Sequence, residues 1–172
     1  MRGLIHRYAV VSLQDPAGVT QSVRELRERA GQQCGTYIIA ERPPDIRQRD
    51  FVRLLLTGFI PVVYVGESVK LQTRVPTIAR GVCGQPSRHA LVKRMPDFNP
   101  PLVKRQLVAI MIPFAWHDSL EAFLLDEHVR VVGRLPIGNR RRRGRSSASN
   151  RPPRIDVTWD RLSGGLTATA IA

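Results

Sequence analysis

Hydrophobic residues alternate with polar ones, or gather in short runs, along much of the chain, and this pattern predicts β-strands. Leu4–Leu13 and Thr36–Ala40 predict the first two strands. Pro61–Val65 is followed by Ser68–Val75, where apolar and polar residues alternate, so together they predict a β-hairpin. The continuous apolar run Leu107–Ile112 predicts a buried strand.

Two short helices are expected between these strands. The first begins at Asp15 and ends at Gly31; a start at Ser22, three residues before Glu25, is the alternative. Its apolar residues, which recur on one helical face, are Val19, Val23, Leu26 and Ala30.

The second half of the chain gives weaker signals. Pro76–Pro101 is interrupted by prolines and is expected to be mostly irregular. Asp118 predicts the start of the second helix, with Glu121 as its capping-box partner. Val129–Ile137 predicts a further strand, after which Gly138 ends the folded body.

Together these elements predict an α+β, β-dominated fold, with a mostly antiparallel sheet or sandwich-like body and two short helices. This domain spans residues 1–138. Residues 139–154 form an Arg-rich flexible segment, expected to be disordered because it has almost nothing apolar to bury. In the 155–172 tail, strand-like residues either fold back as a short hairpin or add to the sheet.

The net charge of +13 is concentrated in two blocks. Residues 68–117 carry eight Lys or Arg and one acidic residue, and residues 138–172 carry eight Arg and two Asp. Such blocks favour a polyanionic partner. Arg outnumbers Lys by 24 to 3, which suits phosphate and RNA contacts, although a coding bias toward Arg would give the same ratio.

The predicted nucleic-acid contacts form a mobile clamp and a second cationic face. The clamp consists of Arg140, Arg141, Arg142, Arg143, Arg145, Arg151 and Arg154. The face consists of Lys70, Arg74, Arg80, Arg88, Lys93, Arg94, Lys104 and Arg105. Counterion release would give affinity without sequence reading, and Arg-rich segments commonly wrap on RNA.

The leading hypothesis is therefore a non-enzymatic nucleic-acid-binding accessory protein, with RNA favoured over DNA and no cofactor. The architecture is similar to that of viral movement, silencing-suppressor and coat proteins, an analogy without a residue-level match. An alternative is an interaction protein whose Arg run is a nuclear or nucleolar targeting signal. Leu54–Leu56 with Phe59 and Ile60 would support a homodimer if exposed.

A metal-dependent hydrolase is the enzymatic alternative. His117, Glu121 and His128 would share a helical face if one helix ran through all three. Because Asp118 predicts the helix cap and a strand is expected from Val129, a capped acidic helix is preferred, with no catalytic or metal residue. GxSxG, P-loop and GxGxxG motifs are absent from the sequence.

Cysteines and hydropathy indicate the compartment. Cys34 and Cys83 lack the spacing of a zinc site and are expected to be reduced. The N-terminal residues lack the apolar core of a signal peptide, and no apolar run is long enough to span a membrane. An intracellular protein is expected, cytoplasmic or nuclear, and not secreted.

Overall fold

The computed structural model describes residues 2–5, 8–31, 33–42, 61–98, 101, 105–140, 154–160 and 165–171. The strands are β1 (Arg2–Ile5), β2 (Ala9–Ser12), β3 (Gly35–Glu41), β4 (Val62–Ser68), β5 (Leu107–Pro113), β6 (Arg154–Asp160) and β7 (Gly165–Ile171). The helices are α1 (Pro16–Ala30), α3 (Leu71–Val82), α4 (Ala90–Arg94) and α5 (His117–Val132), with a 3-10 turn at Met95–Asp97.

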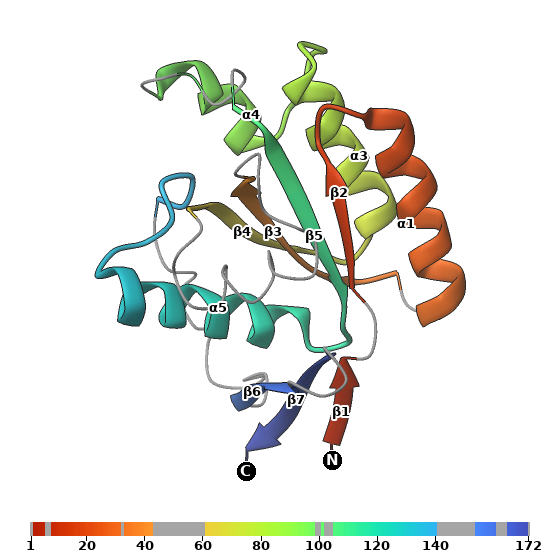
Figure 1. The fold of residues 1–172 in the computed structure, drawn as a ribbon, viewed down its shortest axis with the longest axis vertical. Helices are drawn as coiled ribbons and strands as arrows, with labels where there is room; N and C mark the ends of the chain where they lie inside the picture. The colour runs from red at the N-terminus through yellow and green to blue at the C-terminus, as the bar shows by residue number, and fades with distance from the viewer. Residues whose placement is uncertain are drawn as a thin grey trace.

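Two antiparallel sheets organise these elements (Figure 1). The main sheet has the order β2-β5-β3-β4, which leaves β4 as an edge strand, and the small sheet has the order β1-β7-β6. Helices α1 and α3 lie side by side on one face of the main sheet, and α5 lies on the other (Figure 1). The main sheet is therefore covered on both faces.

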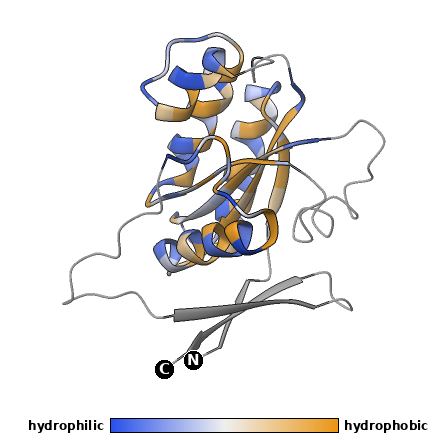
Figure 2. Cartoon of the chain, turned by 90° about the vertical axis from the view of Figure 1, so that its left-hand side faces the viewer, coloured by the Kyte–Doolittle hydropathy of each residue, from blue (hydrophilic) through white to orange (hydrophobic). Residues whose placement is uncertain are grey.

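The central position of β5, between two layers of helices, explains why its sequence is apolar without interruption. Val108, Ile110 and Ile112 pack toward α5, whereas Leu107, Ala109 and Met111 pack toward α1 and α3. All six side chains are at most 2% exposed. Since successive side chains point to opposite faces, a strand buried on both sides must be apolar at every position. The helices correspondingly turn their hydrophobic sides to the sheet (Figure 2).

Several sequence predictions are confirmed. The class is α+β with an antiparallel sheet, and strands lie at Thr36–Ala40, Pro61–Val65 and Leu107–Ile112 within three residues of the expected bounds. Helix α1 begins after Asp15, whose Oδ1 accepts a hydrogen bond from the Gly18 N–H at 2.9 Å. It ends at Gly31, which adopts the left-handed conformation (φ 66°) that favours glycine.

The hairpin predicted over Pro61–Val75 is wrong. Only its first half is a strand, and β4 pairs with β3. Helix α3 begins at Leu71, so Lys70 and Arg74 do not project from a sheet. Its buried apolar residues recur at three- and four-residue intervals, a helical period: Leu71, Val75, Ile78, Ala79 and Val82. This burial outweighs the cost of Pro76 inside the helix.

Two further expectations on local structure are corrected. Pro76–Pro101 is largely helical, since it holds most of α3, all of α4 and the 3-10 turn. The strand expected at Val129–Ile137 is not formed: Val129–Val132 is the last turn of α5, which ends where Gly133 adopts φ 80°, and no regular element follows up to Ile137. Valine favours strands only weakly, and the packing of α5 on the sheet overrides that preference.

The N-terminus of α5 also differs from the prediction. The helix begins at His117, with Trp116 at the N-cap position, so Asp118 lies in the first turn. An acidic side chain there still interacts favourably with the helix dipole. The described part of the chain therefore holds four α-helices, compared with the two predicted.

The segment predicted as one strand at Leu4–Leu13 contributes to both sheets. Its first part is β1, paired with β7, and its second part is β2, paired with β5. Strands β6 and β7 form an antiparallel pair, so the tail folds back as a hairpin that β1 extends. The apolar patch proposed for a homodimer, Leu54–Leu56 with Phe59 and Ile60, lies outside the described residues, as does Arg141–Asn150.

Within the ranges given above, no helix has the length and hydropathy needed to cross a bilayer.

The core predicts a large difference between two Ile→Ala substitutions. Ile110 is 1% exposed between the sheet and α5, whereas Ile137 is 53% exposed. Ile110→Ala should lower the free energy of unfolding by about 2–5 kcal/mol, because it removes buried methyl groups and leaves a cavity. Ile137→Ala, the matched control, should change it by about 0.5 kcal/mol or less. Urea denaturation measures both, and equal losses would contradict this description of the core.

Candidate active site

A cavity of ≈ 620 Å³ lies beside the edge strand β4. Elements from both faces of the sheet contribute to its wall, together with the segment that follows α5. The lining residues are Tyr37, Tyr64, Glu67, Arg74, Arg88, His89, Ala90, Lys93, Arg94, Glu121, Leu125, Gly138, Asn139 and Arg140. This volume is within the range of sites that hold a small molecule or one unit of a polymer.

Two tyrosines form the aromatic part of the wall. Tyr37 on β3 and Tyr64 on β4 lie with their ring centroids 6.0 Å apart. Gly66 pairs with Tyr37 across the two strands, and a Cβ at Gly66 would lie 2.6 Å from the Tyr37 hydroxyl. The absence of a side chain at Gly66 therefore gives the tyrosine pair its space.

The Tyr37 hydroxyl forms a hydrogen bond with His89. Its Nε2 lies 3.1 Å from the Tyr37 oxygen, while its Nδ1 accepts a hydrogen bond from the Leu91 N–H at 3.2 Å as the N-cap of α4. Since a neutral imidazole has one N–H and Nδ1 is an acceptor, we assign the proton to Nε2. His89 then donates to the Tyr37 oxygen, and the Tyr37 hydroxyl donates its own proton in a hydrogen bond to Tyr64.

Burial shapes the protonation of this group of side chains. Burial and the positive charge of Arg74 lower the pKa of His89 to about 4, so its ring is neutral at physiological pH. Burial also raises the pKa of Tyr37 well above its usual value, and the proximity of Tyr64 adds to this effect. At rest the site thus has a neutral imidazole and a protonated phenol.

Two carboxylates complete the chemistry of the cavity. Glu121 projects from α5 and is 8% exposed, and Glu67 projects from β4. The negative charge of Glu121 contributes to the raised pKa values of both Tyr37 and Tyr64. Glu121 therefore acts electrostatically on the same hydroxyl groups that His89 and Arg74 affect.

Five basic side chains gather around the same cavity, against two acidic ones. They are Arg74, Arg88, Lys93, Arg94 and Arg140. They come from α3, the loop before α4, α4 itself and the segment after α5. Charges spread over 67 residues of sequence thus converge on one concave surface.

The segment after α5 is fixed to β4 by its backbone and one side chain. Asn139 accepts a hydrogen bond from the Val65 N–H at 3.0 Å and donates one to the Val65 carbonyl at 2.8 Å. The Gly138 N–H donates to the Val63 carbonyl at 2.7 Å, and Arg94 donates to the Gly138 carbonyl at 3.1 Å. These bonds cover part of the open edge of β4 and bring Arg140 to the cavity.

The other predicted contact residues lie elsewhere. Lys70 and Arg80 are exposed at the two ends of α3, outside the cavity lining, and Arg105 forms an ion pair with Glu41 at 2.9 Å. Arg154 lies on β6. The remaining predicted residues lie outside the described part of the chain: Lys104, Arg141, Arg142, Arg143, Arg145 and Arg151.

The metal set considered from sequence, His117 with Glu121 and His128, is not formed. One helix does carry all three, but the His128 Nδ1 lies 2.7 Å from the Arg134 carbonyl and Glu121 lines the cavity. His117 instead lies beside Glu67 and Asp118, the one set of three or more such ligand groups found within 4.8 Å of each other in the described ranges.

Tyr37, His89 and Glu121 were not identified from the sequence as parts of one site. The residue pairs are brought together by strand pairing and by the packing of α4 and α5, which no local pattern reports. One local signal was available, because a glycine inside a strand-like run, here Gly66, commonly marks a close approach to the backbone.

No protein-family model, curated protein or solved structure matches this chain.

The buried His89 predicts a pH dependence of stability. Its pKa is about 4 in the folded state and about 6.5 when unfolded, so between these values only the unfolded chain takes up the proton. The free energy of unfolding should fall by roughly 3 kcal/mol as the pH drops from 7 to 4. His89→Gln should lack this part of the decrease, measured by urea denaturation at each pH. An identical pH dependence in both proteins would contradict the assignment.

Proposed function

We propose that the protein hydrolyses phosphodiester bonds of nucleic acid in the cavity beside β4. The observation that carries this proposal is the Tyr37–His89 pair, 3.1 Å apart and close to the Glu121 carboxylate, within a ring of basic side chains. A surface that only binds nucleic acid needs the positive charges. It does not need buried proton-transfer groups in the middle of them.

The charge of the cavity favours an anionic polymer as substrate. Five basic side chains against two carboxylates attract phosphate groups, and Arg forms paired hydrogen bonds with phosphate oxygens. The second basic block of the sequence begins at Arg140 in the cavity lining, so the surrounding charge can extend along a bound strand.

The residues have separable roles in the reaction. Arg74, which already affects the pKa values of Tyr37, Tyr64 and His89, holds a non-bridging phosphate oxygen and stabilises the charge that develops on it. Glu121 accepts the proton of the attacking water. Tyr37, whose raised pKa keeps it protonated, gives its proton to the departing oxygen.

These transfers balance. The water oxygen forms a bond to phosphorus as the bond from phosphorus to the departing oxygen breaks, giving a phosphate monoester and a hydroxyl end. The phenolate left on Tyr37 is stabilised by the His89 Nε2–H until it recovers a proton from Glu121 through solvent. RNA and DNA share the phosphodiester, so both are substrates to be tested.

Tyr37→Phe should separate chemistry from binding. The substitution removes one hydroxyl and keeps the ring in its place, so cleavage of labelled single- and double-stranded RNA and DNA with Mg²⁺ present should slow about 100-fold or more. Binding of the same strands should change little. Tyr8→Phe, a tyrosine that packs elsewhere against the core, is the matched control and should cleave like the unchanged protein.

Binding without cleavage by the unchanged protein, on every strand tested, would contradict the hydrolase and leave a nucleic-acid-binding protein. Equal cleavage by Tyr37→Phe would contradict the role of the phenol.

The basic side chains of the cavity predict a salt dependence of binding. Arg88→Ala with Lys93→Ala removes two exposed charges from the cavity wall. The slope of log affinity against log salt should become shallower by about 2. Arg24→Ala with Arg27→Ala removes two exposed charges from α1, outside the cavity, and should change the slope little. Equal effects of the two pairs would indicate that binding follows net charge and not the cavity.

A further inference from the structure

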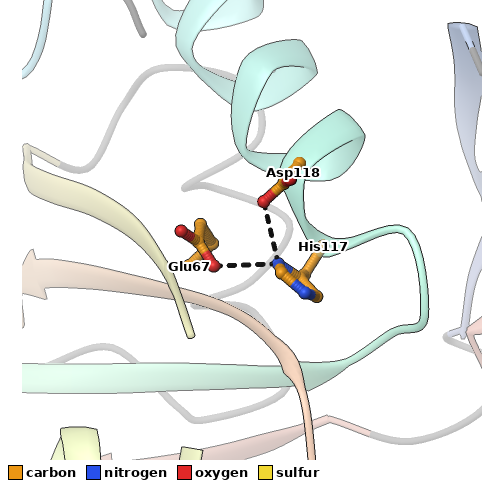
Figure 3. Close-up of side chains that lie close together, drawn as sticks. All are labelled: Glu67, His117 and Asp118. Carbon is orange, nitrogen blue, oxygen red and sulfur yellow. Dashed lines mark ion pairs between the residues drawn. The ribbon is translucent and has the colours of Figure 1, made fainter. Parts of the chain in front are cut away.

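A second group of polar side chains lies at the start of α5. Glu67, one residue before the end of β4, lies near His117 and Asp118, which occupy the first turn of the helix (Figure 3). The His117 Nδ1 lies 2.9 Å from one Glu67 oxygen and 3.0 Å from one Asp118 oxygen. The His117 and Glu67 side chains are 14% and 15% exposed, whereas Asp118 is 53% exposed and borders solvent.

The orientation of the imidazole is the decisive observation. Its Nδ1 is fully buried and makes no hydrogen bond of acceptable geometry within the described ranges, although two carboxylate oxygens lie within 3.0 Å. The direction in which Nδ1 donates or accepts in the plane of the ring therefore misses both oxygens. A metal ion bound along that direction would satisfy the buried nitrogen, which a hydrogen bond to either carboxylate does not.

The separations fit such an ion. A cation bound at about 2.1 Å by neighbouring ligands of an octahedron holds them about 3.0 Å apart, and tetrahedral ligands would be about 3.4 Å apart. The separations of the His117 Nδ1 from the Glu67 oxygen, 2.9 Å, and from the Asp118 oxygen, 3.0 Å, agree with the octahedral value. The exposed side of Asp118 leaves room for water molecules to complete the coordination.

Helix electrostatics account for only part of this cluster. A carboxylate in the first turn, as at Asp118, is favoured by the helix dipole without any metal. The dipole does not favour a second carboxylate, Glu67, beside the same nitrogen. Two carboxylates at one imidazole repel each other, and a divalent cation would cancel their combined charge.

We propose that Glu67, His117 and Asp118 bind one divalent first-row cation with octahedral geometry, such as Mn²⁺, Fe²⁺ or Co²⁺. The imidazole ligand favours these ions over Mg²⁺, and the two carboxylates suit Mn²⁺. Because Glu67 also lines the cavity, the bound cation lies next to the cavity wall. The inference does not rest on the proposed hydrolysis, since cation binding is measured without substrate.

Calorimetric titration of the tag-free full chain with Mn²⁺ tests the site. One Mn²⁺ should bind per chain. His117→Ala and Asp118→Ala should each weaken binding at least about tenfold, because each removes a ligand. His128→Ala removes another histidine of the same helix, which lies near the Arg134 carbonyl, and should bind Mn²⁺ like the unchanged protein.

Three outcomes would overturn the proposal. One is the absence of Mn²⁺ binding by the unchanged protein at millimolar concentration. Another is unchanged affinity in both His117→Ala and Asp118→Ala. The third is loss of binding in Glu121→Gln but in neither of these variants, which would place the cation among the cavity side chains. Circular dichroism of each variant checks that the fold is kept.

Discussion

The hydrogen bonds between Asn139 and Val65 are the interaction on which the candidate site most depends. The amide of one side chain takes the place of a neighbouring strand, because it satisfies both the N–H and the C=O of a residue on the open edge of β4. Gly138 is held by the same docking and receives Arg94 on its carbonyl. Without this attachment the cavity would lose one wall, and Arg140 would have no fixed position.

The second constraint is the space between β3 and β4. A side chain at position 66 would meet both tyrosine rings, so Gly66 is required by close packing and not by its backbone conformation. The Tyr37 hydroxyl can then reach His89, whose Nδ1 is occupied by the start of α4. The N-cap of a five-residue helix thereby fixes the tautomer of the imidazole, which in turn fixes the direction of the bond to Tyr37.

The sequence predicted those parts of the fold that depend on interactions between residues close together in the chain. The apolar run of β5 and the caps of α1 were read correctly because burial on two faces and capping leave marks within a few residues. Helix α3 was missed because the alternation at Ser68–Val75 predicts a strand, whereas the helical spacing becomes clear only over the longer stretch from Leu71 to Val82. The basic residues of the cavity were found as a class, since charge density is visible in the sequence. Their meeting with Tyr37 and Glu121 depends on long-range packing, which one sequence does not report.

Stability alone does not account for the composition of the cavity. Several like charges repel one another around the cavity. Burial also holds the pKa of His89 near 4, so the folded state is destabilised at every pH at which His89 of the unfolded chain is protonated. Apolar side chains at these positions would avoid both costs. The apolar core on both faces of the main sheet supplies the stability that offsets these two costs. Interactions that disfavour the folded state and gather in one concave place are typical of sites shaped by a ligand. Five basic side chains against two acidic ones favour an anion as that ligand.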